Sequence, residues 1–278
     1  TFVINIKKNK ERMKNTEKIL KHNGINFTRM EGHIVNKPRL NYLTNEIEGC
    51  GVSHKNIWEH IVKNNIEHAV IFEDDVTFLK KPWKGYLQKA LKNLPKDWDI
   101  LTLGNFGIKD INDRKTSPFN YMLYLIVTSL NLHNKNYKKI NKYLYIPYFS
   151  TGAYAYAITL DCAKKLLKYI NEITYHIDIL ISKNSDKLNI YSLKNDICYQ
   201  RNEESTINVN THKILQNNNN NLKFFIQFPN DIIDNKNIKY DYYMNVPIYK
   251  IPHVYKNYNI VVNGWLVLVV ILTVIFLF

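Results

Sequence analysis

Three adjacent carboxylates, Glu73, Asp74 and Asp75, follow directly after the apolar run 69–72. Carboxylate oxygens are the ligands that Mg²⁺ and Mn²⁺ prefer, and these ions commonly hold a substrate's phosphates against one or two carboxylates. Clustered negative charges repel one another, which costs stability unless a cation or hydrogen-bond donors compensate. The tripeptide therefore predicts a site for a divalent ion and a phosphorylated ligand, with a solvated acidic turn as the simpler alternative.

The apolar run 69–72 is the element that positions these carboxylates. It is short, and every residue after Ala69 is β-branched or aromatic, which is typical of a strand buried on both faces in a parallel sheet. Ligands of open α/β sheets bind beyond the carboxyl ends of the strands. We therefore expect the carboxylates at the ligand-binding edge of such a sheet.

The first part of the chain alternates between strand-like and helix-like segments. The strands are expected at 2–6, 25–30 and 69–72, and the helices from the polar turn after Lys7 to about Asn23 and from Gly49 through Val62. Gly24 is a plausible stop for the first helix. This β-α-β-α-β order predicts a doubly wound α/β sheet that binds a nucleotide.

The second part of the chain is less regular. The expected elements are a helix at 83–94, a strand at 98–104, a strand region at 149–158, a helix at 162–170 and a late strand at 190–200. Residues 105–145 are poorly patterned, and residues 211–258 form an Asn-rich and aromatic extension.

The formal net charge is +14, which favours anionic partners such as nucleotide-linked substrates. The charge is spread along the chain, and no basic stripe is interleaved with aromatic residues, so we expect no nucleic-acid binding. Cys50, Cys162 and Cys198 lie far apart in the sequence. They are interpreted as small core residues in a reducing compartment.

The segment 259–278 is almost wholly apolar, and no charged residue occurs from Trp265 to Phe278. A helix of about 19 residues spans roughly 28 Å, close to the thickness of a bilayer's hydrocarbon core. Lys250 and Lys256 precede it, which predicts that the N-terminal side is cytosolic. We therefore expect a single-pass membrane anchor with a cytosolic catalytic domain. The alternative is a buried helix.

Eight motifs in order resemble glycosyltransferase family 25, the group of bacterial lipooligosaccharide transferases and collagen galactosyltransferases. The motifs are Phe2–Ile6 with Glu11-Arg12, Met30-Glu31-Gly32, Gly49–His54 with Trp58, Ile71–Val76, Trp98–Leu101 with Gly104, Gly152–Tyr156, Ile177-Asp178, and Gln200 with Glu204-Ser205. The resemblance covers residues 1–210. His176 departs from the pattern, because the family often has proline at that position.

The resemblance implies a Rossmann-like fold of the GT-A type, with a mostly parallel central sheet flanked by helices, over residues 1–210. It implies transfer of a hexose from a UDP- or GDP-hexose to a hydroxyl of a glycan, a lipid-linked sugar or hydroxylysine. We expect this transfer to be inverting and assisted by Mn²⁺ or Mg²⁺.

Each candidate residue has an expected role. Asp75 and Glu73 would bind the metal, and Asp178 would be the general base that deprotonates the acceptor hydroxyl. Ser53 and His54 are expected to open a helix, whose first N–H groups favour an anion. The residues expected to contact the donor are Asn5, Arg12, Ser53, His54, Glu73, Asp74, Gly104, Gly152 and Tyr154. Simpler alternatives are a helix cap for Asp178, a cap and a core histidine for Ser53-His54, and a solvated cation for Arg12.

Three other functions compete with this interpretation. His176-Ile177-Asp178, with His212 or His253 as a third ligand, fits the two-histidine, one-carboxylate pattern of iron oxygenases, but the Asn-rich tail does not supply the strands of that fold. A glycosidase could use paired carboxylates, but it would not need a strand-end cluster suited to a metal. A non-enzymatic, membrane-anchored protein that binds a glycan or a partner is the alternative from another class.

Overall fold

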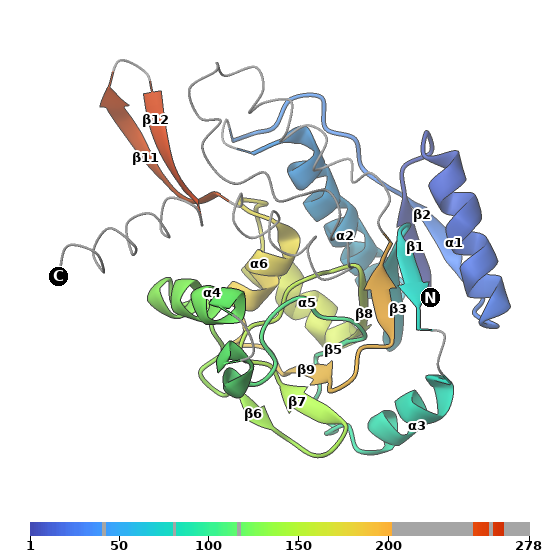
Figure 1. The fold of residues 1–278 in the computed structure, drawn as a ribbon. Coiled ribbons are helices and arrows are strands. Elements are labelled where there is room, and N and C mark those ends of the chain that lie inside the picture. Colours follow the sequence, from blue (N-terminus) through green and yellow to red (C-terminus); the bar gives the residue numbers. More distant parts are fainter. Residues whose placement is uncertain (41–42, 80–81, 116–117, 202–246, 256–257, 264–278) are drawn as a thin grey trace, which may run out of the picture.

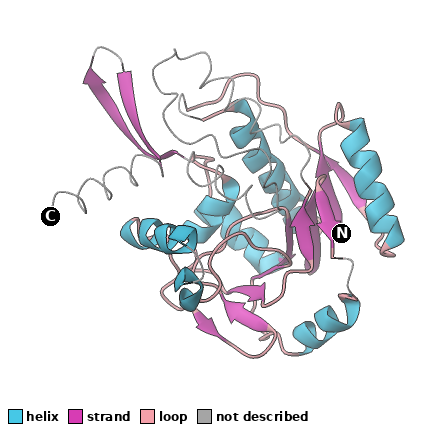
Figure 2. Cartoon of the chain, in the orientation of Figure 1, coloured by secondary structure: helices cyan, strands magenta, loops and turns pink. Residues whose placement is uncertain are grey.

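The computed structural model describes residues 1–40, 43–79, 82–115, 118–201, 247–255 and 258–263. Its centre is an eight-stranded sheet with the strand order β2-β1-β3-β8-β5-β9-β7-β6 (Figure 1). The strands are β1 (Phe2–Asn5), β2 (Thr28–Glu31), β3 (His68–Glu73), β5 (Ile100–Thr102), β6 (Lys138–Lys139), β7 (Leu144–Ile146), β8 (Ala155–Thr159) and β9 (Ile190–Leu193). Helices surround this sheet (Figure 2). They are α1 (Lys10–His22), α2 (Asn45–Lys63), α3 (Lys84–Lys92), α4 (Pro118–Ser129), α5 (Leu160–Tyr169) and α6 (Ile177–Lys183).

The sheet is mixed. The pairs β1-β2, β1-β3 and β5-β9 are parallel, whereas β8 lies between β3 and β5 and is antiparallel to both. β7 is antiparallel to β9 and to β6. Six of the eight strands therefore run in one direction, with β8 and β7 reversed. The α/β class and a mostly parallel sheet flanked by helices are confirmed, although the central strand β3 has an antiparallel neighbour, β8, on one side.

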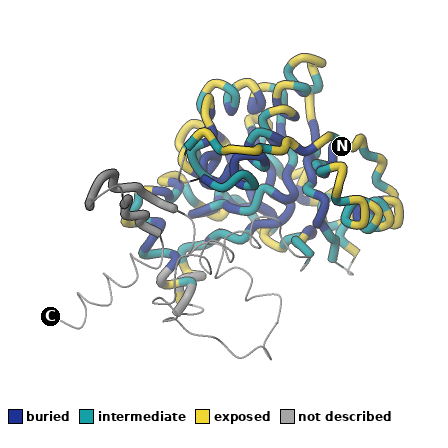
Figure 3. Tube along the Cα trace, turned by 90° about the horizontal axis from the view of Figure 1, so that it is seen from above, coloured by how far each residue is buried: buried dark blue, intermediate teal, exposed yellow. Residues whose placement is uncertain are grey.

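The alternation of side chains along each strand builds one core on each face of the sheet. Neighbouring strand residues point to opposite faces, so Ile71 joins the core under α2, α5 and α6 while Phe72 joins the core under α1 and α3. In α2, Ile57, Trp58 and Ile61 are completely buried in the first of these cores. Figure 3 shows the buried segments through the middle of the molecule and the exposed ones around them. The central strand is thus covered on both faces, as its composition predicts.

Helix α2 begins at Asn45, four residues before the expected start at Gly49. Thr44 caps it, because its hydroxyl accepts a hydrogen bond of 3.2 Å from the backbone N–H of Ile47. Ser53 therefore lies well inside the helix. The expectation that Ser53 and His54 open a helix and offer its first N–H groups to an anion is wrong.

Several other elements differ from expectation. The second strand is Thr28–Glu31 rather than 25–30, and residues 105–145 contain the 3₁₀ turn η1 (Ile111–Lys115), α4, β6 and the start of β7. The expected late strand at 190–200 is two strands in different sheets. The first is β9, and the second, β10 (Cys198–Gln200), pairs antiparallel with β4 (Val76–Phe78), directly after the three carboxylates.

The C-terminal segment is described only in part. Strands β11 (Pro247–Tyr255) and β12 (Tyr258–Asn263) form an antiparallel pair, so the first residues of the expected anchor at 259–278 are in a strand and not in a helix. The remainder, 264–278, lies outside the described residues, as does the expected boundary at 210. Within the described ranges, no helix has both the length and the apolar character that crossing a bilayer requires. The anchor and the cytosolic location stay predictions.

Candidate active site

The ends of β1 and β3 bring the predicted carboxylates to one edge of the sheet. These strands are parallel neighbours, with Ile4 in register with Glu73, so Asn5 and the residues after Glu73 emerge side by side. The buried amide of Asn5 donates a hydrogen bond of 2.6 Å from Nδ2 to Oδ2 of Asp74. The predicted position of the carboxylates at the carboxyl end of a buried strand is confirmed.

A cleft of about 670 Å³ opens over this edge, which is within the usual range of about 300–1,000 Å³ for small-molecule sites. Its walls come from the ends of β1 and β3, the segment 33–36, and parts of α1 and α2. The predicted site residues that line it are Asn5, Arg12, Ser53, His54, Glu73, Asp74 and Asp75. The fold therefore gathers most of the predicted donor and metal residues in one hollow.

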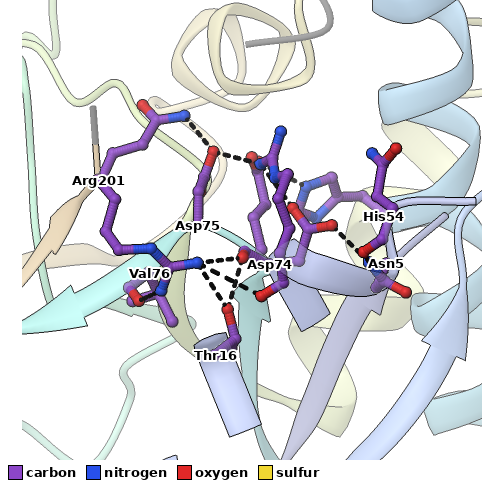
Figure 4. Close-up of polar contacts among 11 residues, drawn as sticks. Asn5, Thr16, His54, Asp74, Asp75, Val76 and Arg201 are labelled. Atoms are coloured by element: carbon purple, nitrogen blue, oxygen red, sulfur yellow. Dashed lines mark hydrogen bonds and ion pairs between the residues drawn. The ribbon is translucent and has the colours of Figure 1, made fainter. Parts of the chain in front are cut away.

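Arg12, on α1, holds both aspartates at the floor of the cleft. Its Nη2 lies 2.5 Å from Oδ1 of Asp74 and 2.7 Å from Oδ2 of Asp75. The aspartates are buried, with 6% and 4% of their surfaces exposed, and Figure 4 shows them between α1 and the adjacent strands. A buried charge is tolerated only when it is paired, so Arg12 is a structural counter-ion of the acidic motif and not a solvated helix cation.

The charge of Asp75 is only partly compensated. Its Oδ2 accepts hydrogen bonds from Arg12 and, at 2.9 Å, from Nε2 of Gln200, but its buried Oδ1 has no partner among the residues that the structure describes. Burial and then the negative charge of Glu73 raise the pKa of Asp75 to about 7, although Arg12 and Gln200 oppose this. Burial also raises the pKa of Asp74. Asp75 is therefore poised to take up a cation or a proton.

Arg201, directly after β10, stabilises the backbone of the acidic motif through hydrogen bonds. Its guanidinium donates to the carbonyl oxygens of Val76 and Asp74, both at 2.7 Å, and to Oγ1 of Thr16 at 3.0 Å. Its backbone N–H donates to the carbonyl oxygen of Asp75 at 2.7 Å. Sequence reasoning missed Arg201 and Thr16 because no local pattern shows that β10 pairs with β4.

Glu73 lies at the end of a buried chain of polar side chains. Nε2 of the completely buried His54 is 3.4 Å from Oε1 of Glu73, and Nδ1 is 2.9 Å from the hydroxyl of Tyr156. Trp58 donates from Nε1 to the same hydroxyl at 3.0 Å. Because the indole N–H can only donate, Tyr156 accepts there and can donate to Nδ1, which leaves Nε2–H for Glu73. In this arrangement Trp58, Tyr156, His54 and Glu73 each have a hydrogen-bond partner.

Ser53 ties α2 to the segment that forms one wall of the cleft. Its hydroxyl donates to the carbonyl oxygen of Gly49 at 2.6 Å and accepts from the backbone N–H of His33 at 2.8 Å. A Cβ atom on Gly49 would lie 2.7 Å from the carbonyl oxygen of His33, so this wall can lie against the helix only where there is no side chain. Ser53 therefore lines the cleft, but both of its hydroxyl hydrogen bonds serve to position the cleft wall.

The other predicted residues lie outside this lining. Asp178 is buried, and its Oδ2 and Oδ1 accept hydrogen bonds of 2.8 Å from the backbone N–H groups of Gly152 and Ile179. Tyr154 is buried and donates to the carbonyl oxygen of Cys198, and Gly104 packs against both. The expected roles of these residues as base and donor contacts stay predictions, and the contacts observed are those of packing and positioning.

A family profile described as glycosyltransferase family 25 (LPS biosynthesis protein) matches residues 1–181. The chain belongs to glycosyltransferase family 25. Among the described residues that line the cleft, only Gln200 lies outside the match, which includes the acidic motif and helix α2. The resemblance of the motifs is thereby confirmed.

Curated relatives in this family differ in their descriptions. The chain is 31% identical over 128 residues to procollagen galactosyltransferase 1-A of Xenopus laevis, covering 45% of this chain and 17% of the relative. It is 28% identical over 128 residues to inactive glycosyltransferase 25 family member 3 of Homo sapiens, covering 45% of this chain and 18% of the relative. The match thus spans less than a fifth of either relative. Among solved structures, A197 from STIV has a TM-score of 0.37 and 11% identity, covering 73% of this chain and 85% of that one, a likeness too weak to support an argument.

Substitution of Gly104 tests whether this glycine is needed for packing or for contact with a ligand. A Cβ atom at Gly104 would collide with the Tyr154 hydroxyl and the Cys198 carbonyl oxygen, so Gly104→Ala should destabilise the fold by about 1–3 kcal/mol, as overpacking does. The measurement is the midpoint of denaturant unfolding. Gly85→Ala is the matched control, since a Cβ atom there meets nothing within 4 Å. Parent-like stability of Gly104→Ala with lost nucleotide binding would instead establish ligand contact.

Proposed function

We propose that this chain transfers a hexose from a nucleotide sugar to a hydroxyl acceptor, with the diphosphate of the donor bound over the carboxylates of the cleft. The observation that supports the proposal is the set of three carboxylates at the end of the buried strand β3, at the floor of a cleft within the region that matches the family. The donor would be a UDP- or GDP-hexose. The acceptor would be a glycan, a lipid-linked sugar or hydroxylysine.

The residues present fit a hard divalent cation. Asp75 keeps its Oδ1 without a partner among the described residues, and the Glu73 side chain is 23% exposed at the cleft. Both offer carboxylate oxygens, the ligands that Mn²⁺ and Mg²⁺ prefer. Bound there, the ion would stabilise the negative charge that develops on the departing nucleoside diphosphate.

The remaining polar groups position this pair of carboxylates and the donor. Asp74 accepts one hydrogen bond from Asn5 and pairs with Arg12, so its role is to orient Arg12. Lys8 and Arg12 line the cleft with positive charge, which a bound diphosphate would need. An inverting transfer also needs a base that removes the proton of the acceptor hydroxyl.

Two carboxylates compete for the role of base. The sequence predicts Asp178, but backbone N–H groups donate to both its oxygens, whereas Glu73 lines the cleft. If Asp178 is the base, Asp178→Asn should lower transfer about 10²–10⁴-fold with unchanged stability and donor binding. If Asp178 holds Gly152 and Ile179, the same variant should lower stability by about 1–3 kcal/mol, because an amide N–H would face a backbone N–H. Melting temperature and single-turnover transfer, measured also for Glu73→Gln, separate these outcomes.

The most direct test of the proposed function is a donor screen. The chain would be incubated with UDP- and GDP-hexoses, with and without Mn²⁺, and release of nucleoside diphosphate would be measured. We expect release from one donor, greater with Mn²⁺ and faster with a suitable hydroxyl acceptor. No release and no nucleotide-induced thermal shift with any donor would contradict the proposal.

A non-enzymatic binding function is the second candidate, because an inactive family member is among the relatives. In that case the cleft would bind a nucleotide sugar or glycan without turnover. A thermal shift with nucleotide sugar, combined with no release of nucleoside diphosphate in the presence of any acceptor, would favour it over transfer.

A further inference from the structure

A second type of ligand set lies beside the acidic motif. The Cys50 thiol, the His54 imidazole and the Glu73 carboxylate each place a ligand atom within 4.8 Å of the other two. Cys50 and His54 are four residues apart on α2, so they lie on the same face of that helix, and Glu73 is the last residue of β3. All three line the cleft.

We propose that Cys50, His54 and Glu73 form a binding site for a soft divalent cation, with Zn²⁺ as the reference ion. Thiolate and imidazole are ligands that select Zn²⁺ over Mg²⁺ and Mn²⁺. Three protein ligands leave the fourth tetrahedral position open, as in zinc sites that accept water or a substrate. This position would face the cleft. The site does not depend on the proposed transferase function.

The surroundings of His54 support the assignment. Metal-bound histidines almost always use their second ring nitrogen to donate to a partner that fixes the ring. Nδ1 of His54 is 2.9 Å from the Tyr156 hydroxyl, which Trp58 holds in place from the other side. A hydroxyl oxygen can accept both the indole N–H and Nδ1–H, so a shift of the imidazole proton to Nδ1 frees Nε2 for the ion. Nε2 is also the nitrogen that faces Glu73.

The site is chemically distinct from the oxygen site at Asp75 but shares Glu73 with it. A soft ion held by Cys50 and His54 would therefore take Glu73 from a hard ion held with Asp75. The two sites can be separated by variants, because Cys50 belongs only to the first and Asp75 only to the second. The other two cysteines, Cys162 and Cys198, are buried in the cores on opposite faces of the sheet and serve as controls.

Cobalt is a suitable probe, because a thiolate bound to Co²⁺ gives a charge-transfer band in the near ultraviolet. Co²⁺ would be titrated into the full chain under reducing conditions, followed by Zn²⁺. We expect the band to saturate at one ion per chain, to disappear when Zn²⁺ displaces Co²⁺, and to be absent from Cys50→Ser. Cys198→Ala and Asp75→Asn should keep it. Tyr156→Phe should weaken binding about 10–100-fold, the usual effect of losing a partner of a metal-bound histidine.

A second measurement uses the unmodified chain and is independent of whether Cys50→Ser folds. Alkylation of Cys50 would be followed by mass spectrometry with and without Zn²⁺ or Mn²⁺. A coordinated thiolate is withheld from the reagent, so Zn²⁺ should slow the reaction about tenfold or more, and Mn²⁺ should not. No cobalt band in the parent chain, a band retained in Cys50→Ser, or no protection by Zn²⁺ would each overturn the proposal. Because no sugar donor is used, these results are independent of the donor screen.

Discussion

Asp75→Asn should nearly abolish the response of the protein to Mn²⁺ plus UDP or GDP. The parent should gain about 5–10 °C in melting temperature at ligand concentrations about 100-fold above Kd, because binding to the native state alone shifts the unfolding equilibrium. Asparagine is a neutral and poorer ligand for a hard cation, so the variant should gain little. Donor turnover should fall by about 10²-fold or more. Differential scanning fluorimetry and the nucleotide-release assay measure the two effects.

The same variant should be at least as stable as the parent without metal. The folded-state pKa of Asp75 is raised to about 7 from an ordinary value of 3.8, so between these values the folded state binds a proton that the unfolded state has lost. The contribution of this group to stability is complete below about pH 4 and is lost as the pH rises through about 7. The stability gap between Asp75→Asn and the parent should therefore widen from pH 4 to pH 7 and then level off. A gap that does not change with pH, or a less stable variant at pH 8, would contradict this.

Asp161→Asn is the matched control, because the Asp161 side chain is 81% exposed and lies on α5. It should leave both the ligand response and the pH dependence unchanged. If Asp75→Asn kept the full shift with Mn²⁺ and nucleotide, Asp75 would be excluded from the site and the metal proposal would lose its main support.

Arg12→Met should cause a large loss of stability at neutral pH. Arg12 is the counter-ion of both buried aspartates, and removal of one partner of a buried ion pair costs about 3–5 kcal/mol. Methionine keeps much of the length and apolar stem of arginine, so the loss reports the charge. The free energy of unfolding, measured in urea at pH 8 and pH 5, should differ more from the parent at pH 8, where Asp74 and Asp75 must be ionised without the Arg12 counter-ion.

A double mutant assigns this loss to the ion pair. Arg12→Met with Asp75→Asn should recover part of the stability, because one of the two stranded charges is removed, and the coupling should exceed about 0.5 kcal/mol. Lys21→Met is the control on the same helix, since Lys21 pairs with Glu17 at the exposed surface and should matter little. Strictly additive effects of Arg12→Met and Asp75→Asn would show that Arg12 does not stabilise the fold through Asp75.

The features of the site that can be predicted are those set by residues close together in the sequence. The run 69–72 predicts a buried strand, because its residues are both apolar and prone to form strands. The acidic residues follow directly, so the same run predicts their position at the end of that strand. Thr44, with Glu46 and Glu48 in the first turn, is a local sequence signal for the start of α2 that apolar periodicity alone does not contain. The error for Ser53-His54 follows from that missed cap.

The parts that were not predictable depend on contacts between distant residues. Because β10 pairs with β4, Gln200 contacts Asp75 across 125 residues of sequence, and Arg201 contacts it as well. The antiparallel direction of β8 is likewise set by its pairing with β3 and β5. The sequence of a short apolar strand does not indicate whether that strand is parallel or antiparallel to its neighbours. Asp178 shows the converse, since a carboxylate near a motif does not show whether a ligand or the backbone will occupy its oxygens.

The position of β8 has a consequence for synthesis on the ribosome. β3 and β5 leave the exit tunnel before residues 155–159, yet neither can complete its ladder until β8 arrives between them. During that interval two apolar strand edges have unpaired N–H and C=O groups, the condition under which nascent chains pair wrongly or aggregate. We expect chains arrested before residue 155 to bind chaperones and resist release. Arrested chains that extend past β9 should become protease-resistant, because only then can both halves of the sheet close around the central strand.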